Sequence, residues 1–420
     1  MTQQCWVLLI ADHYILNFRF NFHFLIERHT MLRILIFSLF LLSSFASQAC
    51  HFDKVDFKSN FSGGRLDECK KLADDRYLLT LKPENTPIND SPWYAFKITA
   101  KQASTITLVM KVNVSNHRYP PKISRDGKHW KLLDYKLNKN KKGNNKLTMK
   151  VHVDNKPTWI SAQELITNQD YYLWGEKLAK KTAVKQSIIG WSVQKRPLFK
   201  LATQGPGNEW LVLLGRQHPP ELTGAMALKP FVETILAKTT LATKFRQRFN
   251  LFIVPDVNPD GVYLGNWRHN ANGFDLNRDW VKFSQPETAA VNTQLLALQQ
   301  QGQKIQMAID FHSTRHSIFY TMPSDYDVED PHFVERWLNA LDKQYGDFKV
   351  KQKPGNNPDL GVFKQYIADT FKVHAITYEM GDNTDRVFIN KLAKSAANQL
   401  MKAMLAKPVL KTTANKKLTK

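Results

Sequence analysis

Two histidines and one glutamate stand where a metal ion could be bound. His218 and Glu221 come just after the apolar run 211–214 (LVLL), and His312 comes directly after the apolar run 305–311. Apolar runs of this length predict buried strands. Two histidines and a glutamate leave a fourth coordination position of zinc open for water, which is the ligand set of a catalytic site. We therefore predict that these three residues bind one Zn²⁺.

The His-x-x-Glu spacing is weak evidence when taken alone. About one such pair is expected from ordinary composition in a chain of this length. A second pair, His332 and Glu335, falls in the predicted helix 331–341, and we interpret it as a surface pair. His316 follows His312 by four residues, but no helix is predicted there, so we interpret it as a pocket or structural histidine.

Four other polar residues have side chains suited to metal-assisted attack of water on a carbonyl group. An arginine beside a metal ion stabilises the oxyanion of a tetrahedral intermediate, and we predict this role for Arg268. Asn277 and Arg278 predict a carboxylate site, because amide and guanidinium groups bind carboxylates directionally. Glu379 ends an apolar run and is predicted to take a proton from the attacking water. The alternative for each arginine is a surface or ion-pairing role, and for Glu379 a pairing with a basic neighbour.

The elements that must position these residues alternate between helix and strand from about residue 167 onward. Apolar periodicity predicts helices at residues 169–181 and 222–236, the first of them capped by Asn168. It predicts buried strands at residues 211–214, 249–254, 305–311 and 374–379. In such α/β sheets ligands collect beyond the carboxyl ends of the strands. We predict a mixed, mostly parallel sheet flanked by helices, in a catalytic domain over residues 167–406.

The preceding part of the chain has a different pattern. Short alternating runs separated by polar turns, such as Asp126-Gly127, predict antiparallel strands at residues 94–98, 105–114, 146–153 and 158–161. We predict an all-β sandwich domain over residues 50–166. The basic, hairpin-like stretch 137–150 is either a solvated loop or a contact for an anionic substrate or wall polymer.

The motifs of the α/β part, taken in order, resemble those of the zinc carboxypeptidase family, which includes the pancreatic carboxypeptidases and the cytosolic deglutamylases. The resemblance covers about residues 169–404. It is carried by six ordered motifs, namely HPPE (218–221), NPDG (258–261), GNWR (265–268), DLNR (275–278), DFHS (310–313) and TYEMG (377–381). The all-β part, with FSGGRLD (61–67) and WYAF (93–96), resembles the amino-terminal domain of the cytosolic carboxypeptidase branch and its bacterial relatives.

This resemblance implies a role for each matching residue, and it implies the same three zinc ligands as the chemistry above. Arg268 would polarise the scissile carbonyl and stabilise the developing oxyanion. Asn277 and Arg278 would bind the terminal carboxylate of the substrate, which restricts cleavage to chain ends. Glu379 would be the general base and then the acid that protonates the leaving amine.

Two further positions bear on substrate recognition. In the pancreatic enzymes a residue about fifteen positions before the catalytic glutamate lies in the side-chain pocket, and here this count arrives near Lys364. A lysine there favours an acidic terminal side chain by charge pairing. The alternative is an ordinary exposed lysine. The candidate for the family's substrate-capping tyrosine is Tyr366.

The start of the chain has the pattern of an export signal. Met31 opens a short basic segment, residues 34–45 form an apolar run of signal-peptide length, and residues 47–49 (SQA) form a small-x-small cleavage site. We predict a signal peptide at residues 31–49 and interpret residues 1–30 as an extension upstream of the true start. The run is too short to span a bilayer. The mature chain is therefore predicted to be periplasmic or secreted, without a membrane span.

Cysteine use agrees with export. Of the three cysteines, the mature chain would keep Cys50 and Cys69, which predict a disulfide in an oxidising compartment. The alternative is lipidation of Cys50, although Ser47 and Gln48 fit a lipoprotein signal poorly.

Composition sets the remaining expectations. The chain has 59 Lys and Arg against 37 Asp and Glu, a formal charge of +22, which favours anionic partners unless basic loops merely solvate the surface. We predict an exported zinc metallocarboxypeptidase that acts on peptides, not on nucleic acid, and that prefers acidic terminal residues or peptidoglycan stem peptides. The alternatives are a zinc-dependent N-acylamino-acid amide hydrolase and an inactive relative that binds cell-wall polymer. The Lys-rich residues 407–420 predict a frayed basic tail.

Overall fold

The computed structural model describes residues 49–140, 143–345 and 348–406. The upstream extension, most of the signal peptide and the basic tail that the sequence predicts lie outside these residues. No helix in the described ranges is long and apolar enough to cross a membrane. The domain boundaries stay predictions.

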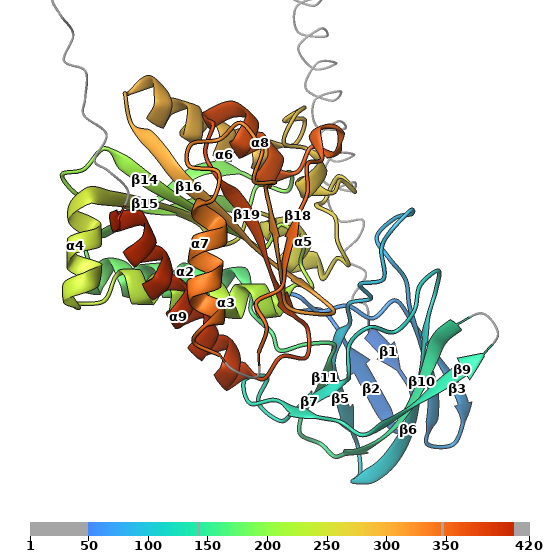
Figure 1. Ribbon diagram of the computed structural model, residues 1–420. Coiled ribbons are helices and arrows are strands. Elements are labelled where there is room, and N and C mark those ends of the chain that lie inside the picture. The colour runs from blue at the N-terminus through green and yellow to red at the C-terminus, as the bar shows by residue number, and fades with distance from the viewer. Residues whose placement is uncertain (1–48, 141–142, 346–347, 407–420) are drawn as a thin grey trace, which may run out of the picture. The chain divides into compact units, whose positions relative to one another are not determined.

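Two β-sheets form the first part of the described chain (Figure 1). Their strands are β1 Ala49–His51, β2 Val55–Lys58, β3 Glu68–Ala73, β4 Arg76–Leu81, β5 Ala95–Ala100, β6 Ser104–Val112, β7 Lys122–Ser124, β8 Lys131–Leu132, β9 Tyr135–Asn140, β10 Gly143–Val153 and β11 Thr158–Ser161. One sheet has the order β1-β2-β5-β11-β7-β8, and the other has the order β3-β4-β6-β10-β9. The antiparallel β9–β10 pair is the hairpin predicted at residues 137–150.

The two sheets share one hydrophobic core, as expected for a sandwich. Phe57 and Phe96 from one sheet and Leu79 and Leu108 from the other are fully buried in it. Strand side chains alternate between the two faces, so each strand contributes every second residue to this core. We call this two-sheet unit the sandwich.

A disulfide joins Cys50 in β1 to Cys69 in β3, with 6.0 Å between their Cα atoms. These strands belong to different sheets, so the bond links the two layers of the sandwich. The predicted Cys50–Cys69 disulfide is confirmed. Because the Cys50 sulfur is bonded to Cys69, it is not available for lipidation.

An eight-stranded mixed sheet forms the second part, with the order β12-β13-β15-β14-β16-β19-β17-β18. Its strands are β12 Val184–Trp191, β13 Pro197–Thr203, β14 Glu209–Gly215, β15 Phe249–Val254, β16 Lys304–Thr314, β17 Ile318–Thr321, β18 Gln352–Pro354 and β19 Ala375–Gly381. The central neighbours β15, β14, β16 and β19 run parallel, whereas β13 and β17 pair antiparallel to them. The predicted mixed sheet flanked by helices is confirmed.

Helices cover both faces of this sheet (Figure 1). They are α2 Asn168–Lys181, α3 Leu222–Ile235, α4 Thr240–Arg248, α5 Pro259–Leu264, α6 Pro286–Gln300, α7 Phe333–Asp342, α8 Phe363–Phe371 and α9 Arg386–Ala406, with the short 3₁₀ turns Leu276–Arg278 and Pro358–Leu360. Side chains of α2, α3, α4, α7 and α9 share one core with the sheet. Side chains of α6 and α8 share the core on the other face.

Three boundaries differ from the sequence prediction. The parallel ladder between β16 and β19 continues to the pair Thr314 and Gly381, so His312 and Glu379 lie inside strands and not at their ends. Helix α2 is capped by Thr167 and not by Asn168. Thr167 and Asp170 form a capping box, each side chain bonding the backbone N–H of the other.

Candidate metal centre and active site

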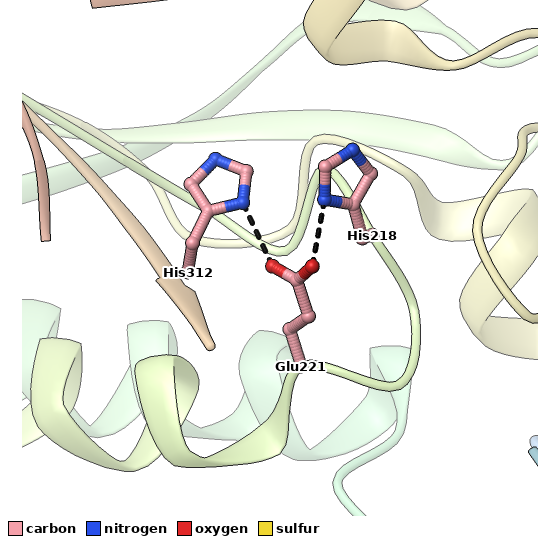
Figure 2. Close-up of side chains that lie close together, drawn as sticks. All are labelled: His218, Glu221 and His312. Carbon is pink, nitrogen blue, oxygen red and sulfur yellow. Dashed lines mark hydrogen bonds and ion pairs between the residues drawn. The ribbon is translucent and has the colours of Figure 1, made fainter. Parts of the chain in front are cut away.

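His218, Glu221 and His312 converge on one point in the structure (Figure 2). His218 Nδ1 lies 2.9 Å from Glu221 Oε1, and His312 Nδ1 lies 2.7 Å from Glu221 Oε2. All three residues are buried, and one nitrogen or oxygen ligand atom of each lies within 4.8 Å of the others. Two imidazole nitrogens and a carboxylate are ligands that zinc takes, so the donor set fits this ion.

The other ring nitrogen of each histidine is bound by a separate carboxylate. His218 Nε2 lies 2.9 Å from Asp275 Oδ1, and His312 Nε2 lies 2.6 Å from Asp310 Oδ2. Such pairs fix the ring orientation of metal-binding histidines and raise their basicity. Here they leave both Nδ1 atoms facing Glu221. Neither aspartate was predicted as a site residue, although Asp275 lies in the DLNR motif and Asp310 in the DFHS motif.

The turn that carries His218 is stabilised by hydrogen bonds of the Arg216 side chain. Arg216 adopts a left-handed backbone conformation (φ 59°), which is costly for a residue other than glycine. Its buried side chain donates from Nε to the carbonyl of Pro219 (2.9 Å) and from Nη1 to the Tyr171 hydroxyl (3.0 Å). These bonds offset the strain and fix the path of the chain from β14 to Glu221.

Close packing brings the end of this turn to His312. A Cβ atom added at Gly224 in α3 would lie 2.5 Å from the backbone oxygen of His312. Only glycine allows the helix to approach the strand this closely. The contact fixes the distance between the element that follows Glu221 and the strand that carries His312.

The charges of this cluster shift its pKa values in opposite directions. Burial alone raises the pKa of Glu221, but the charges of His218 and His312 outweigh it and lower that pKa well below its usual value. Burial alone lowers the pKa of His312, but the charges of Asp310 and Glu221 raise that pKa well above 6.5. Glu221 is therefore an anion at neutral pH, as a metal ligand must be.

Five of the predicted catalytic and substrate residues line one cavity of about 290 Å³ with this cluster, namely Arg268, Asn277, Arg278, Lys364 and Glu379. Arg268 donates from Nε to Asp275 Oδ2 (2.7 Å), the carboxylate that also contacts His218. Arg278 is exposed, and its Nη1 donates to the Asn277 carbonyl (2.7 Å). Asn277 Oδ1 accepts from the backbone N–H of Phe363 (3.0 Å), which orients its amide.

Glu379 lies beside His312 in the sheet. The two residues are register partners on β19 and β16. Among the described residues, no group donates a hydrogen bond to its buried Oε2 atom. Burial, and then the negative charge of Glu221, raise the pKa of Glu379 to about 8, although His312 and Arg118 oppose this shift. A carboxyl group with such a pKa can both accept and donate a proton near neutral pH.

Lys364 is not the exposed lysine that the sequence left as an alternative. It is 4% exposed, and its Nζ donates to the carbonyls of Thr321 (3.1 Å) and Gly355 (2.5 Å). Burial lowers its pKa to about 8. The carbonyls orient its ammonium group without neutralising its charge.

The structure does not bring Tyr366 to the cavity. Its ring stacks on Trp280 (centroids 5.8 Å apart), and its hydroxyl contacts Asn292. The tyrosine that does line the cavity is Tyr320 in β17, a register partner of Thr377. Burial, and then the charge of Glu379, raise the pKa of Tyr320. The sequence motifs gave no indication of Tyr320, because it lies on a separate strand, β17, outside all of them.

Two interpretations of other histidines have different outcomes. His332 and Glu335 are exposed, and their side chains contact each other through Nδ1 and Oε2 (3.1 Å), so the surface interpretation is confirmed. His316 is exposed and not part of the cavity lining, so its interpretation as a pocket or structural histidine is wrong. The chain turns outward between β16 and β17 and carries it into solvent.

The sandwich contributes two residues to the cavity, Asn89 and Arg118. Arg118 donates from Nε and Nη2 to both oxygens of Asp382 (2.7 and 3.0 Å), and from Nη2 to the Ser313 carbonyl (3.1 Å). Neither residue was predicted from the sequence. They lie about 100 to 290 residues before the other residues of the cavity lining, so no local spacing reports their position.

Comparison with known proteins agrees with the family that the sequence motifs resemble. A family model described as zinc carboxypeptidase matches residues 171–400. An uncharacterized protein of Zymomonas mobilis is 24% identical over 349 residues, covering 78% of this chain and 87% of that protein. Cytosolic carboxypeptidase 3 of Bos taurus is 24% identical over 306 residues, covering 64% of this chain. The match spans only 30% of the length of that bovine relative.

Solved structures share the fold. A metallo-carboxypeptidase from Burkholderia cenocepacia superposes with a TM-score of 0.70 at 19% identity, covering 84% of this chain and 98% of that one. A metallo-carboxypeptidase from Pseudomonas aeruginosa superposes with a TM-score of 0.68 at 18% identity, covering 83% and 98%. Both alignments are longer than the residues that the family model matches, so the similarity in fold extends into the sandwich.

Proposed function

The chain belongs to the zinc carboxypeptidase family, and from this premise we propose that it hydrolyses the C-terminal peptide bond of peptides. One observation carries the proposal. The convergent His218, Glu221 and His312 share a cavity with the half-buried carboxyl of Glu379, whose Oε2 is buried, and with an exposed guanidinium, Arg278. A metal, a proton acceptor and a carboxylate receptor are the parts that removal of a terminal residue requires.

His218 Nδ1, His312 Nδ1 and the Glu221 carboxylate would bind one Zn²⁺. When bound by three such ligands, zinc acts as a Lewis acid that activates water for attack on a carbonyl. Asp275 and Asp310 bind the opposite ring nitrogens and so orient the two histidines.

Glu379 and Arg268 would act on the reacting atoms. Glu379 accepts a proton from water as the new carbon–oxygen bond forms, and returns a proton to the amine nitrogen as the carbon–nitrogen bond breaks. Arg268 donates hydrogen bonds to the carbonyl oxygen as negative charge develops there. Its Nε is fixed on Asp275, which leaves the terminal nitrogens for this contact.

Asn277 and Arg278 would bind the terminal carboxylate of the substrate. A guanidinium and a carboxylate form a planar, directional pair. Because this receptor lies in the same small cavity as the metal cluster, only a bond close to a chain end can reach the reacting groups.

Substrate preference follows from Lys364. Its ammonium group, oriented in the cavity lining by two carbonyls, would pair with an acidic terminal side chain. The formal charge of +22 also suits anionic peptides, including peptidoglycan stem peptides. The signal-peptide pattern and the Cys50–Cys69 disulfide support a periplasmic or secreted location.

The test is mass spectrometry of a peptide mixture that varies only in its last residue. The zinc-loaded chain starting at Cys50 is compared with the Glu379→Gln variant. We expect loss of single terminal residues, with acidic residues lost first, and a decrease in rate of at least about 10²-fold in the variant, which lacks the proton acceptor. If every peptide survives intact, the proposal for linear peptides fails, and acylamino acids become the substrates to test.

A further inference from the structure

The backbone around Arg268 is bound by a residue of the sandwich. Glu84, in the loop between β4 and β5, accepts three consecutive backbone hydrogen bonds. They come from Trp267 (2.8 Å), Arg268 (2.9 Å) and His269 (2.7 Å). The Glu84 side chain is only 10% exposed. Charge-assisted bonds of this kind are about twice as strong as neutral ones, and burial strengthens them further.

The side chains beside Arg268 are also held by the sandwich. Trp267 is fully buried within the hydrophobic core of the two sandwich sheets. His269 Nδ1 lies 2.6 Å from Asn85 Oδ1, and Asn85 Nδ2 donates to the Gly273 carbonyl (2.8 Å). The residues on both sides of Arg268 are therefore anchored in a unit that lies about 180 residues earlier in the chain.

The Arg268 side chain is fixed at one further point. Its Nε donates to Asp275 Oδ2, and within the described chain no residue hydrogen-bonds its terminal nitrogens Nη1 and Nη2. The backbone is fixed by Glu84 and the middle of the side chain by Asp275. The two terminal nitrogens then remain in the cavity as the only free donors of this arginine.

We propose that Glu84 is a positioning residue for hydrolysis, acting through Arg268. This inference rests on the proposed role of Arg268 in the site. A displacement of about 1 Å in a catalytic group costs on the order of 10²-fold in rate. By binding three amides of one short segment, Glu84 prevents such a displacement. The sandwich then supplies part of the catalytic apparatus and is not an independent binding module.

A double-mutant cycle tests this proposal. Glu84→Ala, Arg268→Ala and the double variant are compared with the unaltered zinc-loaded chain, and kcat and KM are measured separately. We expect Glu84→Ala to lower kcat by about 10- to 100-fold with little change in KM. Arg268→Ala should lower kcat by about 10²- to 10³-fold. The double variant should be no slower than Arg268→Ala, because the two residues act as one unit.

Two further variants separate positioning from stability. Asn85→Ala removes bonds from the same loop to the same segment but leaves the Arg268 amide bound, so kcat should fall less than in Glu84→Ala. Glu84→Gln keeps the shape of the side chain and one acceptor oxygen, so it should fold even if Glu84→Ala does not. Its kcat should lie between those of the unaltered chain and Glu84→Ala. Zinc content should stay at one ion per chain in all of them.

Amide hydrogen exchange gives a readout that does not require turnover. Glu84→Ala should accelerate exchange at residues 267–269 while exchange in β14 and β16 is unchanged. If the effects of Glu84→Ala and Arg268→Ala on kcat multiply in full, or exchange at residues 267–269 is unaltered, the proposal is overturned. If the unaltered chain cleaves no peptide, the proposed function fails, whereas faster exchange in Glu84→Ala would still establish the anchoring of this segment.

Discussion

At the scale of single residues, the site depends on charges that are held out of water. His312 is flanked by two carboxylates, Asp310 and Glu221, and its pKa is raised well above 6.5 in consequence. The pKa of Glu379 is also raised, to about 8, first by burial and then by the negative charge of Glu221. A cation bound by this cluster would take the place of the proton on His312. Its positive charge would also offset the negative charge of Glu221 beside Glu379.

Zinc affinity is expected to depend steeply on pH. The metal binds the neutral ring of His312, so below its raised pKa a proton must leave first. Affinity should therefore fall as the pH is lowered through neutrality, by up to tenfold per unit for this one proton. Calorimetry in buffers of different ionisation enthalpy measures the protons released. Zinc binding at pH 7 without proton release would contradict the assignment of a protonated His312.

Preference for acidic terminal residues is expected to depend on Lys364. Lys364→Ala should lower kcat/KM for peptides ending in Glu, relative to Leu, by about tenfold or more, since a charged hydrogen bond contributes roughly 1.5–3 kcal/mol. In the unaltered chain the same preference should decline as the pH rises through about 8, the pKa at which Lys364 loses its charge. The exposed Lys394 in α9, which is not part of the cavity lining, provides the control Lys394→Ala. An unchanged ranking of terminal residues in Lys364→Ala would exclude the role.

At the scale of elements, the site depends on how closely three of them approach. Strand β16 delivers His312, β19 delivers Glu379, and α3 begins just after Glu221 and packs against β16 at Gly224. The side chains converge because the backbones of these elements are already in contact.

Gly224→Ala is expected to damage the site without altering any functional side chain. The new Cβ would lie 2.5 Å from the His312 oxygen and 2.7 Å from its carbonyl carbon, so α3 or β16 must shift. Overpacking of this kind costs typically about 1–3 kcal/mol. Thermal unfolding and zinc titration should show lower stability and weaker binding. Gly355→Ala is the control, since its nearest neighbour lies at 3.7 Å. Unchanged zinc affinity in Gly224→Ala would show that the contact does not matter.

The arrangement of the elements also explains which site residues could be predicted from the sequence and which could not. His218, Glu221 and His312 were found because each follows a short apolar run that forms a strand, and strand type is a local property of the chain. Glu84 and Arg118 were missed because their partners lie far away in sequence, and only tertiary structure brings them together. Tyr366, which lies in none of the motifs, does not reach the cavity, and this could not be predicted because the sequence does not report which face of α8 meets Trp280.

At the scale of the whole described chain, the sandwich and the eight-stranded sheet form a shared site. Sandwich residues bind the Arg268 segment through Glu84 and the Asp382 carboxylate through Arg118. Changes in the sandwich should therefore affect the site even where no substrate contact is lost.

Loss of the disulfide is expected to lower stability. Cys50 and Cys69 are 19 residues apart and belong to different sheets, and closing a loop of this size contributes about 3 kcal/mol. The double variant Cys50→Ser and Cys69→Ser should unfold at a lower temperature, and reductant should shift the unaltered chain to the same midpoint. Equal midpoints with and without reductant, at full thiol release, would contradict this. Zinc content at 25 °C should not change.

The pairing of His312 with Glu379 also bears on how relatives of this chain can diverge. The two residues are opposite each other on adjacent strands, so their separation follows from the spacing of a β-sheet, about 4.8 Å, and not from any loop. Loops that border the cavity, such as the one carrying Asn357 and Leu360, can therefore lengthen or change in sequence without altering the distance between the proposed metal ligand and the proposed base. Selection can thus change the cavity lining while the spacing of these two residues is inherited intact.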